Sequence, residues 1–361
     1  MKQIFDYFAT DGKVLSYRPW GDGHINRTFL FTTDQGRKYI LQRINDSVFR
    51  NVDALMENIV NVTGFLRKKG LDPRHVLTLV PLVSTTLQDP LWFIKWEEES
   101  TDFSPGYYRV YEFITGGLCL SHPDTCEDFR QSAIAFGQFQ RDLSDFNASI
   151  LHETIPHFHD TRDRYAKFHA ALDADAAGRV KEVQSEIDFL LCREKEAGHM
   201  LDMRDEGKLP ERVTHNDTKL NNVIFDAASR TPLCVIDLDT VMPGLAGYDF
   251  GDAIRFGANT GSEDEKDLSK ISVDMDMFCA FTDGFLSVCG SSLLPEEIET
   301  LPLGARIITI EQAIRFLTDY LEGDIYYHTD YPGHNLDRTR TQIRLVLDME
   351  EKWEQMRREV C

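Results

Sequence analysis

The chain has 361 residues, and its 60 acidic side chains against 39 basic ones give a net charge of −21 at neutral pH. A field of this sign repels nucleic acids and anionic membranes, and no apolar run approaches the roughly 18 residues of a membrane helix, so we expect neither partner. The seven cysteines show no Cys-x-x-Cys spacing, and acids interrupt the apolar N-terminal residues, so we predict a cytoplasmic protein without disulfides, structural zinc or a secretory signal.

The first third of the chain predicts strands and one helix. Residues 27–34 and 38–44 alternate polar and apolar side chains around a polar turn, which is typical of a β-hairpin. Residues 51–70 carry apolar side chains at helical spacing and end at a glycine, a common stop signal. Residues 91–99 and 107–114 predict two more strands.

The remainder of the chain predicts mainly helices. Apolar stripes at helical spacing occur in 128–146, 175–203, 307–322 and 337–357. Strand-like segments around 213–240 interrupt them. We therefore predict an α+β fold with two lobes, in which residues 1–113 form a small β-rich lobe with one main helix and residues 114–361 form a larger, mainly helical lobe.

Carboxylates and amides crowd two stretches of the second lobe, VTHNDTKLNNVIFD at 213–226 and VIDLDT at 235–240. A carboxylate at Asp217 can accept the proton of an attacking hydroxyl, and Asn222 with Asp237 offers the oxygen ligands that Mg²⁺ prefers. The alternative is an ordinary turn, which Asn and Asp also favour. The combination of all three residues at kinase-like spacing favours chemistry.

A glycine-containing segment stands just before the first predicted strand, and it reads Gly21, Asp22, Gly23, His24, Ile25 and Asn26. Glycines let backbone N–H groups approach phosphates closely. The segment lacks the strand-to-helix setting of a dinucleotide fold, and the chain contains no Gly-x-x-x-x-Gly-Lys loop. A hairpin that covers phosphates is the use that fits this position, and an ordinary two-glycine turn is the alternative.

These strings together carry a resemblance to a known family. HNDTKLNN with VIDLDT, GDGHIN, YYRVYEFITGG and YDFGD resemble the aminoglycoside phosphotransferase and choline kinase group, which has a protein-kinase-like fold. The longer strings PWGDGHIN, VTHNDTKLNN, RFLTDYLEGDIYY and NLDRTRTQIRLV resemble bacterial N-acetylhexosamine 1-kinases. Enzymes of that family use ATP to phosphorylate the anomeric hydroxyl of N-acetylglucosamine or N-acetylgalactosamine.

The resemblance implies roles for the central acids and amides. Asp217 would be the catalytic base and would contact the sugar hydroxyl, and Asn222 and Asp237 would be the Mg²⁺ ligands. Asp239, two residues beyond Asp237 on the same predicted strand, would face the same side and join the metal or the sugar. His215 is expected to orient the loop rather than to transfer protons.

The resemblance also implies an ATP site. The segment from Gly21 to Asn26 would cover the phosphates, and the backbone of Glu112, Phe113 and Ile114 would form the hinge that meets the adenine. The third strand of the small lobe departs from the family pattern, because Gln42 stands where a lysine or arginine is usual.

Three answers to this missing cation stay open. Gln42 and other donors suffice, or Lys38 or Arg43 reaches the phosphates from another position, although strand alternation turns Arg43 to the opposite face. Glu57 on the following helix could pair with such a cation, and the alternative is a solvated surface acid.

The sugar site is expected to combine polar donors with a flat aromatic ring. The candidates are His24, Arg315 and the pair Tyr326 and Tyr327. For Arg315 a second interpretation stays open, an ion pair with Asp319 on the surface of the same helix.

Two further motifs receive structural interpretations. Asp249 and Asp252 of YDFGD are expected to hold the catalytic loop or to cap a helix, and HETIPHFHD at 152–160 is expected to be a loop rather than a metal site. The competing functions are a kinase for choline, homoserine or an aminoglycoside, and a catalytically dead nucleotide sensor. The enzyme is expected to act as a monomer or homodimer.

Overall fold

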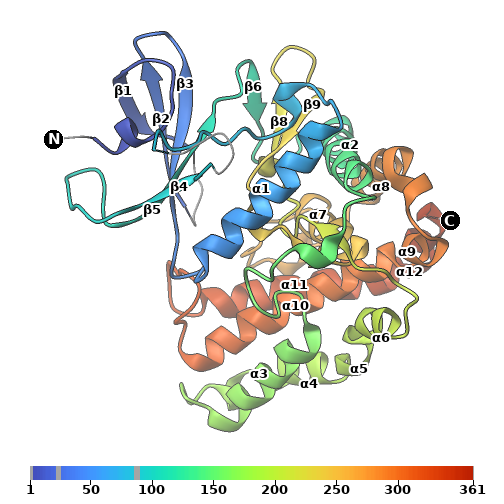
Figure 1. The fold of residues 1–361 in the computed structure, drawn as a ribbon. Coiled ribbons are helices and arrows are strands. Elements are labelled where there is room, and N and C mark those ends of the chain that lie inside the picture. Colours follow the sequence, from blue (N-terminus) through green and yellow to red (C-terminus); the bar gives the residue numbers. More distant parts are fainter. Residues whose placement is uncertain (1–2, 22–25, 85–89, 361) are drawn as a thin grey trace.

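The computed structural model describes residues 3–21, 26–84 and 90–360. The chain folds into a strand-rich lobe built from its N-terminal part and a mainly helical lobe built from the rest (Figure 1). The predicted α+β architecture with two lobes is confirmed.

Five antiparallel strands form the sheet of the first lobe, in the spatial order β1-β2-β3-β5-β4. They are β1 (Val14–Pro19), β2 (Arg27–Thr33), β3 (Lys38–Ile44), β4 (Phe93–Trp96) and β5 (Gly106–Glu112). The sequence does not predict β1, because five of its six residues are exposed and the strand lacks apolar alternation. The segment 21–26 therefore joins β1 to β2, and the expectation that it precedes the first strand is wrong.

The register of the sheet aligns three polar residues. Gln42 on β3 lies directly opposite Thr28 on β2 and Arg109 on β5. Residues opposite one another in an antiparallel sheet point to the same face. The side chains of these residues therefore form one row across the middle of the sheet.

Helix α1 (Val52–Lys68) packs against both lobes. The hydrophobic core around it combines side chains of the helix with side chains of the second lobe, among them Leu55, Ile59, Val62, Phe139, Leu233 and Val241. In the same contact, the buried Asn58 amide donates to the carbonyl groups of His152 and Val241 at 2.8 and 3.0 Å, and its oxygen accepts from the N–H of His152 at 2.8 Å. The helix is thus fixed to the second lobe.

Helices make up most of the second lobe. They are α2 (Cys126–Asp142), α3 (Thr161–Ala174), α4 (Gln184–Leu191), α5 (Glu194–Ala197), α6 (His199–Asp205), α7 (Ala246–Gly257), α8 (Met275–Cys289), α9 (Pro295–Glu299), α10 (Leu301–Glu322), α11 (His334–Glu351) and α12 (Trp353–Val360). The apolar stripe at 175–203 is divided among three short helices, because the chain turns at Arg193 and again at Gly198.

Short strands of the second lobe position the polar stretches singled out in the sequence. β7 (Arg212–Thr214) pairs with β10 (Met242–Gly244), and β8 (Val223–Asp226) pairs with β6 (Gly117–Cys119) and β9 (Pro232–Val235). The loop 215–222 leaves β7 and enters β8. The strand expected over 235–240 ends at Val235, and residues 238–240 form a short 3₁₀ turn.

Two predictions about the environment of the chain can be compared with the structure. Within the described ranges, no helix combines the length and apolar character needed to cross a membrane. The six cysteines within those ranges are free thiols.

Replacing Asn58 by alanine should weaken the joint between α1 and the second lobe. The variant leaves the half-buried N–H and C=O groups of His152 and the buried C=O of Val241 without their partner. We expect the free energy of unfolding in urea to fall by about 2–4 kcal/mol. Asn61→Ala on the same helix is the control, and equal losses in the two variants would contradict the role given to Asn58.

Candidate active site

Helix α7 holds the loop 215–222 through its carboxylates. The N–H groups of His215 and Asn216 donate to the two oxygens of Asp249 at 2.8 and 2.7 Å, and the N–H of Thr218 donates to Asp252 at 3.1 Å. Asn216 has a left-handed backbone with φ 63°, and this conformation turns the loop away from β7. The prediction that Asp249 and Asp252 hold the catalytic loop is confirmed.

His215 is fully buried and uses both ring nitrogens on the backbone. Its Nδ1 accepts from the N–H of Asp217 at 3.3 Å, and its Nε2 lies 2.9 Å from the carbonyl oxygen of Ile236. This pattern corresponds to a neutral imidazole with the proton on Nε2. His215 thus orients Asp217 and ties the loop to the segment after β9, as the sequence predicts.

Asp217 lies at the surface of the loop and is a quarter exposed. One oxygen forms an ion pair with Nζ of Lys219 at 2.8 Å, and the other accepts from Nδ2 of Asn222 at 2.9 Å. Burial alone would raise the pKa of Asp217, but the positive charge of Lys219 and the hydrogen bonds from Lys219 and Asn222 outweigh it and lower the pKa. Asp217 is therefore ionised at neutral pH, which is the form that can accept a proton.

Asp237 is a carboxylate that has no counter-ion among the described residues. Its backbone is left-handed, with φ 59°, and no described residue donates a hydrogen bond to its side chain or pairs with it. Burial, followed by the negative charges of Asp239 and Asp217, raises the pKa of Asp237 to about 7. A carboxylate in this environment favours a cation beside it.

The donor set fits Mg²⁺. The amide nitrogen of Asn222 donates to the main-chain and side-chain oxygens of Asp217, so its side-chain oxygen is left as a candidate ligand atom. The main-chain oxygen of Asn222 accepts from the N–H of Ile236 at 2.9 Å, one residue before Asp237. Among the described residues, no group of three or more His, Cys, Asp or Glu side chains could hold a metal ion. Mg²⁺ usually takes only one or two carboxylates from the protein and completes its shell with water and phosphate oxygens.

Asp239 is almost fully buried at the junction of the two lobes. One of its oxygens lies 2.6 Å from Nη2 of Arg109 on β5, and the other accepts from Nδ2 of Asn26 at 2.7 Å. The residue lies in the 3₁₀ turn 238–240, so the strand alternation that placed it on the same side as Asp237 is wrong. Its carboxylate still acts on Asp237 through its charge.

The candidate cations for the small lobe take different positions. Arg43 donates to the carbonyl oxygen of Pro105, which confirms that it points to the opposite face of β3. Lys38 lies over the ring of Phe113. Glu57 does not meet a cation of the sheet, because its carboxylate pairs with His152 at 2.9 Å.

Only part of the predicted nucleotide segment lies within the described residues. Gly21 has a positive φ of 75°. Asn26 donates to Asp239 through Nδ2, and its side-chain oxygen accepts from the N–H of Asn45 in the first lobe at 3.0 Å. Four predicted residues fall outside the described ranges, namely Asp22, Gly23, His24 and Ile25.

The hinge candidates follow β5. The N–H of Glu112 donates to the carbonyl of Thr78 at 2.8 Å, and the N–H of Phe113 donates to the carbonyl of Lys38 at 3.1 Å. Both backbone donors are used within the first lobe. The predicted contact with adenine therefore depends on their carbonyl groups and on Ile114.

A second group of candidates gathers around Arg315 on α10. Its guanidinium lies 5.6 Å from the ring centroid of Phe158 and 5.7 Å from that of Tyr327, and it donates to Gln312 at 3.1 Å. Tyr326 is 67% exposed and packs edge-on against Tyr327. Among the described residues, no hydrogen bond or ion pair joins this group directly to Asp217, Asn222 or Asp237.

Asp319 organises the chain beside Arg315 instead of pairing with it. Its buried carboxylate accepts hydrogen bonds from the consecutive N–H groups of Ile325, Tyr326 and Tyr327 at 2.9, 2.7 and 3.0 Å. The alternative of an Arg315–Asp319 surface pair is therefore wrong. The carboxylate of Asp319 is buried and holds the backbone of the loop that carries the two tyrosines.

The segment 152–160 connects the two groups. Thr154 donates to the main-chain oxygen of Asp239 at 3.0 Å, and six residues further on Asp160 caps α3. Between them, Nδ1 of His159 lies 3.2 Å from Oε2 of Glu311. Glu311 is one turn before Arg315 on α10. The segment is a loop, as predicted, but it spans from the acidic site to the arginine.

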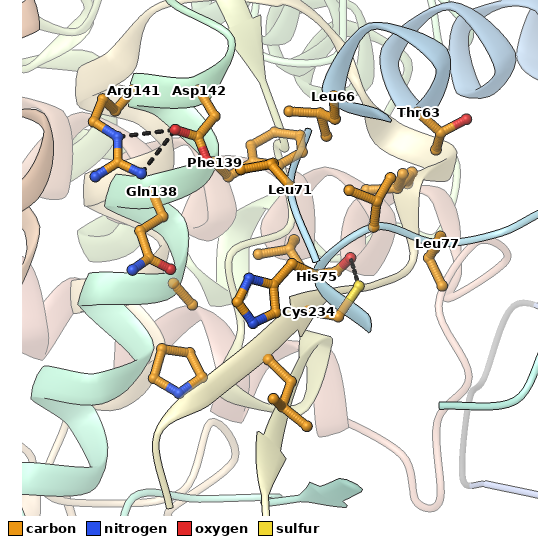
Figure 2. Close-up of a pocket in the computed structure, with 16 residues that line it drawn as sticks. Thr63, Leu66, Leu71, His75, Leu77, Gln138, Phe139, Arg141, Asp142 and Cys234 are labelled. Carbon is orange, nitrogen blue, oxygen red and sulfur yellow. Dashed lines mark hydrogen bonds and ion pairs between the residues drawn. The ribbon is translucent and has the colours of Figure 1, made fainter. Parts of the chain in front are cut away.

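A separate cavity of about 280 Å³ lies between α1, α2 and β9 (Figure 2). Figure 2 shows Gln138 and Phe139 of α2, Leu66 of α1, and His75 beside Cys234 among the residues that line it. Neither Asp217, Asn222 nor Asp237 lines the cavity. It is therefore distinct from the site that these residues form.

Sequence reasoning missed three residues that contact the site. Arg109 is a cation within an apolar strand, and Lys219 lies two residues beyond the predicted base, so each offered a local signal. Thr154 offered none, because its contact with Asp239 depends on the fold of the 152–160 loop.

Comparison with known proteins gives one family and many similar folds. The sequence model of the phosphotransferase enzyme family matches residues 16–269. Among solved structures, the microcompartment-associated aminopropanol kinase is 15% identical, with TM-score 0.63 over 98% of this chain and 96% of that chain. An aminoglycoside phosphotransferase from Alicyclobacillus acidocaldarius is 14% identical, with TM-score 0.64 over 99% and 95%. A spectinomycin phosphotransferase in complex with ADP and spectinomycin is 11% identical, with TM-score 0.58 over 95% and 94%. These likenesses establish the kinase-like fold.

The metal-free protein should lose stability as pH rises, because of Asp237. The pKa of Asp237 is near 3.8 in the unfolded chain and about 7 in the folded protein, so folding favours the protonated carboxyl group. The stability that this preference contributes is fully present below about pH 4 and is lost as pH rises through about 7. We expect Asp237→Asn to be more stable than the parent protein by about 2–4 kcal/mol near pH 8, and by less near pH 5. Urea unfolding with a chelator present measures the difference, with Asp173→Asn as the control. A difference that is equal at both pH values would contradict the raised pKa.

Proposed function

The chain belongs to the phosphotransferase enzyme family, and from that premise we propose that it transfers the terminal phosphoryl group of ATP to the anomeric (C1) hydroxyl of an N-acetylhexosamine. The products would be ADP and the sugar 1-phosphate. Mg²⁺ would be the cofactor. The proposal rests on the chemistry of two groups of residues, the acidic site around Asp217 and the aromatic group around Arg315.

Asp217 has the charge and position of a general base. Its lowered pKa keeps it ionised at neutral pH, and the side-chain amide of Asn222 fixes the direction of one of its oxygens. In the proposed step the sugar oxygen bonds to the γ-phosphorus, the bond between that phosphorus and the leaving oxygen of ADP breaks, and the hydroxyl proton passes to Asp217. A base of this kind contributes about 10²–10⁴-fold to the rate.

The metal would lie between the loop and the segment after β9. Asn222 would offer its side-chain oxygen and Asp237 its carboxylate, and the bound ion would neutralise charge on the β- and γ-phosphate oxygens. Lys219, paired with Asp217 at 2.8 Å, adds a second positive charge on the same side of the loop.

The observation that carries the sugar assignment is the environment of Arg315. Its guanidinium lies among the rings of Phe158 and Tyr327, with Gln312 as a hydrogen-bond partner. Neutral hydroxyl and acetamide groups can accept from a guanidinium while the sugar ring lies against an aromatic face. Choline or another cationic acceptor would instead favour aromatic rings without a positive charge beside them.

Amino-alcohol and aminoglycoside acceptors form the second candidate class. The net charge of −21 attracts cationic acceptors, and the similar structures include an aminopropanol kinase and aminoglycoside phosphotransferases. Arg315 is the residue that favours the sugar over these acceptors. His24 and Tyr326 remain sugar-binding predictions from the sequence.

A phosphate-transfer screen should separate the acceptor classes. With Mg²⁺ and ATP, we expect saturable phosphorylation of N-acetylglucosamine or N-acetylgalactosamine, and a product whose phosphate is released by mild acid, because anomeric phosphates hydrolyse easily. The same screen includes choline, homoserine, aminopropanol and an aminoglycoside. Saturable transfer to one of these with none to the N-acetylhexosamines would overturn the sugar assignment.

Asp217→Asn should lower kcat by about 10²–10⁴-fold while Mg·ATP affinity changes little, because the amide keeps the shape but cannot take the proton. Initial rates and calorimetric titration of the nucleotide measure the two quantities. Asp173→Asn, an exposed change on α3, is the control for loss of a carboxylate. Near-normal turnover of Asp217→Asn would remove the residue from the mechanism.

A further inference from the structure

The position of the missing strand cation is filled by a hydrogen-bonded amide. Gln42 on β3 donates through Nε2 to the hydroxyl of Thr28 at 3.2 Å. Its Oε1 accepts from both Nε and Nη2 of Arg109, at 3.2 and 3.0 Å. Both polar atoms of the Gln42 amide are thus hydrogen-bonded within the sheet. Its oxygen is the acceptor for the guanidinium of Arg109 on the neighbouring strand.

Arg109 is a buried cation in direct contact with Asp239. Its side chain is 1% exposed, and its Nη2 lies 2.6 Å from Asp239 of the second lobe. Among the described residues, its Nη1 has one hydrogen-bond partner, the sulfur of Met56 on α1 at 3.8 Å. A guanidinium is costly to bury unless it is paired and hydrogen-bonded, so its position is determined by Asp239 and Gln42 together.

The contact of Arg109 also reaches the segment that carries the predicted metal ligand Asp237. Asp239, whose carboxylate lies 2.6 Å from Nη2 of Arg109, is two residues beyond Asp237 in the chain. The other oxygen of Asp239 holds Asn26, the last residue of the glycine-containing segment. One cation therefore links the sheet, the acids and the end of that segment.

We propose that Arg109 of β5 supplies the cation that β3 lacks, and that it acts as a positioning residue for the nucleotide site, with Gln42 as the residue that orients it. The inference rests on the proposed ATP-dependent function. In this arrangement the cation reaches across the lobes to Asp239, and α1 contributes no acidic partner. Loss of the guanidinium would leave Asp239 as an unpaired buried charge and release Asn26 from its fixed position.

Calorimetric titration with Mg·ATP, without any acceptor, tests this role. We expect Arg109→Met to weaken Mg·ATP binding by about 30-fold or more, as removal of one partner of a buried ion pair does. Arg109→Lys, which keeps the charge but not the planar fork, and Gln42→Leu, which removes the orienting amide, should each weaken binding by about 3–10-fold. Arg43→Met is the matched control, because its side chain lies on the opposite face of β3 and donates to Pro105.

Moving the cation across the sheet gives the sharpest test. Gln42 and Arg109 are directly opposite and point to the same face, so Gln42→Lys combined with Arg109→Met returns a positive charge to the row from β3. We expect this double variant to bind Mg·ATP at least about threefold more tightly than Arg109→Met alone. Thermal unfolding of each variant checks that it is folded.

The outcomes separate this inference from the proposed function. A parent protein that binds no Mg·ATP would refute the proposed function itself. If the parent binds and folded Arg109→Met binds equally well, or if the double variant gives no recovery, the inference is overturned. Should Arg109→Met fail to fold, Arg109→Lys and Gln42→Leu decide, and parent-like binding by both overturns the inference.

Discussion

The buried ion pair between Arg109 and Asp239 sets the geometry on which the site depends. Two charges withdrawn from water need further hydrogen-bond partners, and here Gln42 accepts from Arg109 while Asn26 donates to Asp239. The pair joins the middle of the sheet to the turn after β9. It thereby fixes Asn26 of the first lobe relative to Asp239 of the second lobe.

Three neighbouring carboxylates differ because their surroundings differ. Asp217 has Lys219 and an amide beside it, so its pKa is lowered. Asp237 has no partner in the described structure and is repelled by two acids, so its pKa is raised. Asp239 is paired with a guanidinium. The same type of side chain thus has three different charge environments within one turn-rich region, since pKa values follow environment.

Local patterns predict the parts of this molecule that local physics determines. The hairpin β2–β3 and helix α1 follow from alternation and helical spacing, and Asp217 and Asn222 share one short loop. Strand β1 is not predicted because five of its six residues are exposed, and its sequence therefore lacks the alternation of apolar and polar side chains. The strand expected at 235–240 fails because Asp237 takes a left-handed backbone. The place of Arg109 depends on the register of three strands and on a contact between lobes, so no sequence window contains it.

The packing of α1 has a mechanical consequence. Its apolar face shares one hydrophobic core with Ile44 and Tyr111 of the first lobe and with Phe139 and Val241 of the second lobe, and Asn58 adds hydrogen bonds to the second lobe. A movement of one lobe relative to the other would therefore have to disturb the packing on at least one side of this helix. The sequence places α1 in the first lobe, whereas its contacts tie it to both.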